Sequence, residues 1–264
     1  MKAKVKAFQI NENVVFWKWI NTNTIGIVTE TSVYHWSMEG DSNPTLLFSR
    51  HASLAGTQII NYKANEDLTW VVLIGIKATE GGKVGGFMQL YSMEKRVSQP
   101  IEGYAASFCQ YPLGQGYETT VLSFSTGNKL HIVEVASANK PKPEGVAVFT
   151  KKAVDISFSA DAPNDFPVAM QTSSKYNVIY LISKWGYIHL YDIESGTCLY
   201  MNRISGETIF VTALHAATDG IIGINKKGQV LTVGVNPDTI VPYIQQTLGN
   251  VPLAVKWASR YSLP

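Results

Sequence analysis

The five histidines are the residues in this sequence best suited to bind a metal ion or to transfer a proton. They are His35, His51, His131, His189 and His215. No two of them are separated by the three or four residues that place two metal ligands on one face of a helix. Three of them, His35, His131 and His189, occupy similar places in repeated segments, which indicates a repeated packing position. We therefore predict no metal site.

A glycine-rich stretch and two neighbouring carboxylates are the other candidates for chemistry. Within residues 81–86, Val84 follows Lys83 where a phosphate-binding loop needs Ser or Thr, and the stretch joins two predicted strands. Asp192 and Glu194 fall in a predicted turn, with no second carboxylate paired for acid and base work. The sequence contains no nucleophile elbow and no Cys-His pair at a recognisable spacing. We predict no catalytic residue, no cofactor and no enzymatic activity.

Composition excludes several other classes of protein. The chain has 264 residues, a formal net charge of +2 and only 16% charged residues, with no basic stripe. Nucleic-acid binding is therefore not predicted. Cys109 and Cys198 lie too far apart for a disulfide framework, which favours the cytoplasm. The longest apolar runs, such as residues 70–76, are far shorter than the roughly 20 residues that cross a bilayer.

Strand-like segments arranged as hairpins dominate the sequence. Each hairpin consists of a run of β-branched and aromatic residues, a turn, and a second alternating run. The five copies span residues 24–37, 70–92, 119–135, 177–193 and 220–235. Four of them carry a glycine near the start of the second strand, where a positive φ or a close backbone approach favours glycine. These glycines are Gly86, Gly127, Gly186 and Gly228.

Further strand-like segments lie between the hairpins and give each repeat three or four strands. They read FWKWI, TQIINY, ASFCQY, DISFS, PVAMQT and TIFVTAL. A sheet of this size cannot cover both of its own faces, so stacking such sheets around an axis, as a β-propeller does, buries the most apolar surface. A long β-sandwich is the alternative. The repeated hairpin and the near absence of helix before residue 236 favour the propeller.

The two ends of the chain depart from this repeat. Residues 2–10 begin by alternating Lys with Ala or Val, as far as residue 7, and predict a strand with no partner hairpin before it. This indicates that the chain begins inside a repeat. After residue 235 the strand pattern stops. Pro237 suits the first position of a helix, with the Asn236 side chain as its cap, and the segment IVPYIQQTL is predicted to be a short helix. A second helix is predicted to start in the same way after Gly249.

Longer strings within these segments resemble the N-terminal domain of the clathrin heavy chain. They include FWKWI, SVYHWSMEG, RHASLAGTQIINY, SQPIEG, NDFPVAM, YIHLYD and GTCLYMNRISGETIFVT. The similarity runs along almost the whole chain. It is interrupted near residues 78–82, 111–126 and 137–150, where the sequence departs from the family.

The resemblance implies an all-β, seven-bladed β-propeller followed by a short α-helical linker. Here about five to six blades are expected, without the first blade and most of the second. Residues 1–236 would form the partial, adaptor-binding propeller, and residues 237–264 would start the linker.

The family's role implies a non-enzymatic component of the clathrin coat, at the cytoplasmic face of coated pits and vesicles. Its propeller binds short linear motifs of adaptor and accessory proteins in vesicle transport and endocytosis, and adaptors hold it peripherally at the membrane. Light chains and other heavy chains would bind regions outside this chain.

The resemblance also implies three sites for peptide motifs. The clathrin-box groove is matched in part, by Lys2 and Lys4, and a tryptophan-motif pocket is matched in part, by Gln58, Ile60 and Ile76. The groove for an arrestin-type leucine-rich motif is matched throughout, by Trp70, Leu90, Lys95, Val97 and Gln99. Lys95 stands where the family has arginine, so the bidentate geometry of a guanidinium is absent there.

Two other functions remain open at this point. A purely structural repeat propeller would have no peptide ligand, so that Trp70→Ala would change stability alone. An enzyme on a propeller scaffold would need titratable groups that converge in the central channel.

Overall fold

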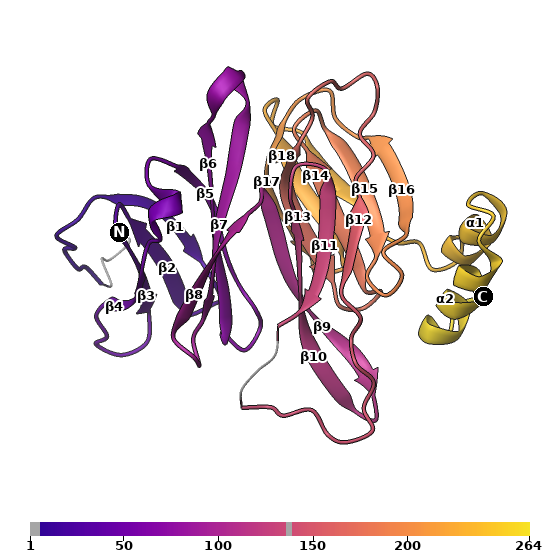
Figure 1. Ribbon diagram of the computed structural model, residues 1–264, viewed down its shortest axis with the longest axis horizontal. Coiled ribbons are helices and arrows are strands. Elements are labelled where there is room, and N and C mark those ends of the chain that lie inside the picture. Colours follow the sequence, from indigo (N-terminus) through magenta and orange to yellow (C-terminus); the bar gives the residue numbers. More distant parts are fainter. Residues whose placement is uncertain (1–5, 136–138) are drawn as a thin grey trace, which may run out of the picture. The chain divides into compact units, whose positions relative to one another are not determined.

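A computed structural model describes residues 6–135 and 139–264 (Figure 1). The contacts between residues divide the chain into two compact units. The described part of the first unit comprises residues 6–106 and 139–142, and the second comprises residues 107–135 and 143–264. Each unit is built from short antiparallel sheets and is described below by itself.

The first unit contains two four-stranded sheets. One has the strand order β1-β2-β3-β4 and the other β5-β6-β7-β8, so every neighbour in each sheet is also a neighbour in sequence. The strands are β1 (Val14–Trp19), β2 (Thr24–Thr29), β3 (Ser32–Ser37), β4 (Thr45–Ser49), β5 (Gln58–Ala64), β6 (Trp70–Ala78), β7 (Val84–Ser92) and β8 (Val97–Glu102). Two single 3₁₀ turns, Ala52–Leu54 and Glu80–Gly82, complete the unit.

The core of the first unit lies between these two sheets. Val28 and Val33 of the first sheet belong to the same buried cluster as Tyr62 and Leu73 of the second. One face of the β5–β8 sheet therefore packs on the β1–β4 sheet. Successive side chains of a strand point to opposite faces of the sheet, so the residues on either side of Leu73 in β6 lie on the opposite face.

The second unit contains three sheets and two helices. Its sheets have the orders β12-β11-β10-β9, β13-β14-β15-β16 and β17-β18-β19. The strands are β9 (Ala105–Gly114), β10 (Tyr117–Ser125), β11 (Lys129–Glu134), β12 (Lys152–Asp155), β13 (Pro167–Ser173), β14 (Val178–Ser183), β15 (Tyr187–Asp192), β16 (Cys198–Arg203), β17 (Ile209–His215), β18 (Gly220–Asn225) and β19 (Val230–Val233). The helices are α1 (Ile240–Gln246) and α2 (Val251–Tyr261).

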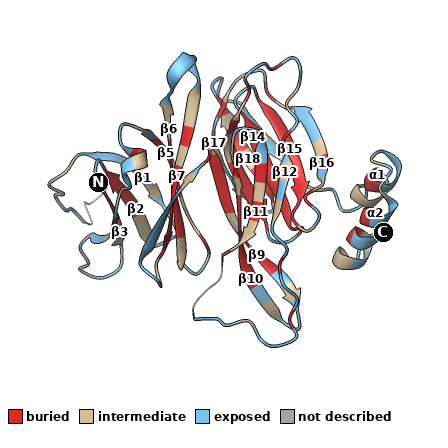
Figure 2. Cartoon of the chain, in the orientation of Figure 1, coloured by how far each residue is buried: buried red, intermediate tan, exposed pale blue. Residues whose placement is uncertain are grey.

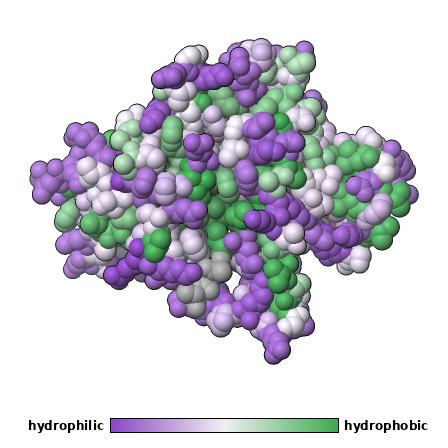
Figure 3. Space-filling view, in the orientation of Figure 1, coloured by the Kyte–Doolittle hydropathy of each residue, from purple (hydrophilic) through white to green (hydrophobic). Residues whose placement is uncertain are grey.

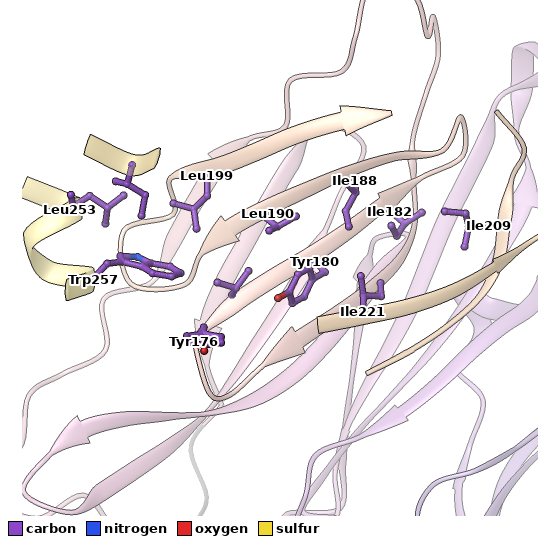
Figure 4. Close-up of a cluster of buried hydrophobic side chains, with 13 residues drawn as sticks. Tyr176, Tyr180, Ile182, Ile188, Leu190, Leu199, Ile209, Ile221, Leu253 and Trp257 are labelled. Carbon is purple, nitrogen blue, oxygen red and sulfur yellow. The ribbon is translucent and has the colours of Figure 1, made fainter. Parts of the chain in front are cut away.

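A cluster of aromatic and branched side chains holds the second unit together (Figure 4). Tyr180 and Ile188 come from β14 and β15, Ile221 from β18, and Trp257 from α2, and all are nearly or fully buried. Strands β14 and β15 are buried along their length, whereas β16 is mostly exposed (Figure 2). Since each such side chain contributes about 1.5 to 3 kcal/mol when buried, helix α2 is held largely by Trp257 and its neighbours.

All five predicted hairpins are present, as β2–β3, β6–β7, β10–β11, β14–β15 and β18–β19. Their glycines are not equivalent. Gly186 and Gly228 have φ values of 81° and 77°, as predicted. Gly86 serves the other predicted purpose, because a Cβ there would lie 2.4 Å from the carbonyl oxygen of Gly103. Gly127 has neither a positive φ nor a close neighbour, so the prediction is wrong there.

Three local predictions are corrected. Residues 6–10 form no strand, because the Lys6 ammonium donates to the carbonyl oxygens of Ser37 and Glu39 and draws the segment across the end of β3. Strand β12 ends at Asp155, so the segment DISFS is not a strand. Helix α1 begins at Ile240, as the segment IVPYIQQTL predicts, and not at Pro237. The Asn236 side chain accepts a hydrogen bond from the Asp238 N–H in the turn before the helix.

The second helix matches its prediction. Helix α2 starts after Asn250, whose side-chain oxygen accepts a hydrogen bond from the Leu253 N–H at 3.1 Å. Proline occupies the first turn, where its missing N–H has no partner to lose. Five separate sheets, counted over the described residues, also contradict the β-sandwich alternative.

Candidate peptide-binding site

Trp70 begins strand β6 and is held by the turn before it. The Trp70 N–H donates to the side-chain oxygen of Asn65 at 2.8 Å, and the Trp70 carbonyl accepts from the Asn65 N–H at 3.0 Å. Asn65 is itself fixed, because its amide donates to Asp67 at 2.6 Å and to Thr69 at 2.9 Å. This side-chain network was not recognised in the sequence, although the pattern Asn-x-Asp-x-Thr before a strand is a signal for it.

The pairing register places four of the five predicted arrestin-type groove residues on one face of the β5–β8 sheet. Trp70 lies opposite Ser92, and Ser92 lies opposite Val97. In the next row on the same face, Leu90 lies opposite Gln99. Residues that are directly opposite, or two apart along a strand, project from the same side of a sheet. We call this set, Trp70, Leu90, Val97 and Gln99, the Trp70 face.

The Trp70 face combines a buried floor with an exposed rim. Leu90 is buried, whereas Val97 is 59% exposed and Gln99 is also exposed. The indole nitrogen of Trp70 is buried and has no hydrogen-bond partner among the described residues. Such an unpaired donor is uncommon, because a buried indole N–H usually finds a hydrogen-bond partner.

Lys95 lies beside this face, in the turn between β7 and β8. Its N–H donates to the Ser92 hydroxyl at 3.2 Å, and the next residue, Arg96, adopts a left-handed conformation with a φ of 53°. The Lys95 side chain is exposed. It therefore supplies a mobile positive charge at the edge of the Trp70 face, without the fixed fork of a guanidinium.

The three residues matched to the tryptophan-motif pocket also lie together, at the far end of the same sheet. Gln58 pairs directly with Ile76, and Ile60 lies in a bulge two residues further along β5. Ile76 follows Trp70 by six positions in β6, which separates the two sets by about 20 Å. The same sheet thus carries both sets.

The remaining predicted residues, Lys2 and Lys4, lie outside the described residues. Within residues 6–135 and 139–264, no group of three or more His, Cys, Asp or Glu residues is placed to hold a metal ion. None of the helices in that same part of the chain has the length and apolar character of a membrane span.

The histidines are interior packing residues in two of the three repeated positions. The His35 ring nitrogen Nε2 shares a hydrogen bond of 2.9 Å with the Tyr62 hydroxyl, and His189 is 1% exposed. Burial lowers the pKa of His35 to about 4, and it lowers the pKa of His189 to about 4 as well. Both rings are therefore neutral near pH 7. His131 differs, since it stacks on Phe124 and is only half-buried.

Comparison with known proteins identifies the family. The family Clathrin propeller repeat matches residues 54–94 and 160–194, and the family Clathrin, heavy-chain linker matches residues 237–260. The clathrin heavy chain of Drosophila melanogaster is 56% identical over 268 residues and covers 100% of this chain. The chain is a clathrin heavy chain homologue along its whole length. Clathrin heavy chain 2 of Homo sapiens is 53% identical and the probable clathrin heavy chain of Schizosaccharomyces pombe is 47% identical, each again over 100% of this chain.

The homology also establishes the fold class. The first match, residues 54–94, covers strands β5 to β7, which carry Trp70 and Leu90. The fold is a β-propeller followed by a short helical linker, as predicted. A solved structure, that of Saccharomyces cerevisiae Sqt1, shares this fold with a TM-score of 0.56 and 16% identity over 86% of this chain and 60% of that one. The chain spans 16% of the length of the clathrin heavy chains it matches.

Proposed function

We propose that this chain is the motif-binding propeller of a clathrin coat and that the Trp70 face binds an arrestin-type leucine-rich motif. The observation that carries the proposal is the register, which brings Trp70, Leu90, Val97 and Gln99 onto one face of one sheet. A shared face supports the proposal, because one extended peptide could contact all four side chains at once. The proposal includes a propeller up to residue 236, a linker from residue 237, and a location on the cytoplasmic side of coated membranes.

The chemistry of the Trp70 face suits a short extended peptide. A leucine of the motif would pack on the Trp70 ring and against Val97, and the exposed Gln99 amide would donate to a peptide carbonyl oxygen. An acidic residue next to the leucines would lie near Lys95. Two or three buried apolar side chains supply about 1.5 to 3 kcal/mol each, and an exposed ion pair supplies about 0 to 1 kcal/mol.

Ordering the peptide and losing its translational freedom offset much of this free energy, so one motif would bind weakly. Several motifs on one adaptor, facing many copies of the propeller in a coat, would bind tightly through avidity. Contacts of this kind allow a coat to assemble and to come apart. No step of this function requires a catalytic residue.

Binding of a labelled peptide tests the proposal. A fluorescein-labelled, leucine-rich, arrestin-type peptide is titrated with the chain and with Trp70→Ala, and fluorescence polarisation is measured. Trp185→Ala is the matched control, because Trp185 is 42% exposed in the β14–β15 turn of the second unit. We expect saturable binding that Trp70→Ala removes and Trp185→Ala retains, with circular dichroism showing that all three chains are folded. A folded chain that binds no peptide would instead favour a purely structural propeller.

A further inference from the structure

A second groove lies in the second unit, at the end of strand β9 and beside the segment that precedes strand β12. Its volume is about 440 Å³. Strand β9 contributes Tyr111 and Leu113, the segment before β12 contributes Phe149, and Lys152 and Glu194 stand at its walls. Apolar surface gathers over the β9–β10 hairpin in the corresponding region of Figure 3. A volume of this size accommodates a few side chains of a peptide.

The floor of this groove is aromatic and firmly packed. Tyr111 and Phe149 meet edge to face with ring centroids 5.2 Å apart, and each is only 8% exposed. Val148 stands at the rim and is 77% exposed. A rigid aromatic floor with an exposed apolar rim is the arrangement that anchors a branched or aromatic side chain of a partner.

The two charged residues at the walls of the groove differ in whether they have a partner of opposite charge. Glu194 is engaged by two cations of helix α2, with its Oε1 3.4 Å from the Lys256 ammonium and its Oε2 in contact with Arg260. The Lys152 ammonium, by contrast, donates to the carbonyl oxygen of Thr150 at 2.8 Å and lies 4.8 Å from the centre of the Phe149 ring. No carboxylate pairs with Lys152 among the described residues.

Lys152 is also held in place. Its Cδ lies 3.5 Å from the position that a Cβ on Gly196 would occupy, so its stem packs along the turn that follows Glu194. Burial lowers the pKa of Lys152, and the charge of Asp192 opposes this effect. An ammonium has three donors, of which the Thr150 carbonyl takes one. A carboxylate from a ligand would satisfy the others.

We propose that this groove binds an extended acidic peptide, with an apolar side chain against Tyr111 and Phe149 and a carboxylate at Lys152. A basic peptide is disfavoured, because the nearby carboxylates already have cationic partners. The proposal shares with the proposed function only the class of partner, and it requires no residue of the Trp70 face.

A labelled peptide pool tests this groove in the Trp70→Ala background, where the Trp70 face is disabled. The pool consists of fluorescein-labelled octapeptides with Leu, Ile, Met or Phe at two positions and Asp or Glu at two others. Lys152→Met keeps the packed stem and removes the charge. The matched control is Lys184→Met, which removes an exposed charge from the β14–β15 turn of the same unit.

We expect saturable binding to Trp70→Ala, weakened about twofold to fivefold by Lys152→Met and unchanged by Lys184→Met. Two substitutions of the exposed rim residue Val148 should change the affinity in opposite directions, because they introduce opposite charges. Val148→Glu should weaken binding of the acidic peptides and Val148→Lys should strengthen it. If the substitutions disturbed the fold instead, both variants would bind more weakly. The proposal is overturned if the wild-type chain binds the pool but Trp70→Ala does not, or if Lys152→Met and both Val148 variants bind alike. The first of these results leaves the proposed function intact. Absence of binding of the pool to the wild-type chain would also overturn the proposal for this groove, whereas the proposed function is decided separately, by the titration with the arrestin-type peptide.

Discussion

The indole N–H of Trp257 donates a hydrogen bond to a carboxylate oxygen of Asp192 at 3.1 Å, and both residues are completely buried. The same oxygen accepts from Arg260 at 3.1 Å, and the second oxygen accepts from the N–H and the hydroxyl of Ser195. Trp257 and Arg260 belong to helix α2, whereas Asp192 ends strand β15. One carboxylate therefore joins the start of the helical linker to the β13–β16 sheet.

Asp192→Asn should destabilise the second unit strongly. The substitution removes the charge that Arg260 pairs with and turns one acceptor into a donor, and breaking a buried ion pair costs about 3 to 5 kcal/mol. The free energy of unfolding, measured by urea denaturation, checks this expectation. Asp155→Asn is the control, because Asp155 pairs with Lys129 at 2.7 Å on the surface, where loss of the pair costs less than about 1 kcal/mol. Equal losses in the two variants would contradict the role of Asp192.

Mild acid should destabilise the fold through two histidines, the buried His189 and the partly buried His35. Burial holds the pKa of His35 and of His189 at about 4 in the folded chain, below the ordinary value of 6.5. Between these values the unfolded chain binds more protons than the folded chain, so stability falls as the pH decreases from 6.5 towards 4. At pH 5 each histidine accounts for about 2 kcal/mol.

Urea denaturation between pH 7 and pH 5 measures this dependence. The double variant His35→Gln and His189→Gln should show a smaller change in the free energy of unfolding between pH 7 and pH 5. The exposed His51→Gln is the matched control. An unchanged slope in the double variant would show that other groups are responsible.

Gly→Ala substitutions in three hairpin turns of similar sequence should lower the free energy of unfolding by different amounts. Gly186→Ala should cost the most, at least about 3 kcal/mol, because its φ is positive and the new Cβ would lie 2.2 Å from the Ser205 carbonyl oxygen. Gly228→Ala meets open space and should cost about 1 to 2 kcal/mol for its positive φ alone. Gly127→Ala should be neutral or slightly stabilising. Thermal unfolding of the three variants gives the order, and equal costs would contradict it.

Much of this fold follows from local sequence patterns. Alternating apolar residues and turn residues place all five hairpins, and Asn250 with the following proline places helix α2. The Trp70 face was reached differently, through resemblance to a family, because nothing in the residues around Trp70 separates a binding face from ordinary packing. Its geometry depends on the register between β6, β7 and β8, and side-chain period alone does not set register between strands.

The errors have a common physical cause. The strand predicted over residues 2–10 rested on the alternation of residues 2–7, but residues 6–10 form no strand and Lys6 instead donates hydrogen bonds to Ser37 and Glu39. The groove at Tyr111 and Phe149 was missed for the same reason, since its walls come from β9, the segment before β12 and the turn after β15. Contacts between residues so far apart leave no periodic signal in a single sequence.

Lys95→Arg should strengthen binding of a leucine-rich motif that carries an acidic residue. Arginine offers a planar, bidentate donor to a carboxylate, whereas Lys95 offers a mobile point charge. We expect the dissociation constant to fall about twofold to fivefold in a polarisation titration. The same peptide with Asn in place of the acidic residue is the control and should bind both chains equally. Equal affinities for the acidic peptide would place the acidic residue away from Lys95.

The most direct test of the central claim is the indole N–H signal of Trp70 in a nuclear magnetic resonance titration with the arrestin-type peptide. The chain has six tryptophans, so six indole signals are assigned by single Trp→Phe variants in a ¹⁵N-labelled chain. The account predicts that the Trp70 signal shifts and saturates with the peptide, while those of Trp185 and Trp257 in the second unit stay in place. A peptide that saturates the chain without moving the Trp70 signal would show that the motif binds elsewhere, and would contradict the account.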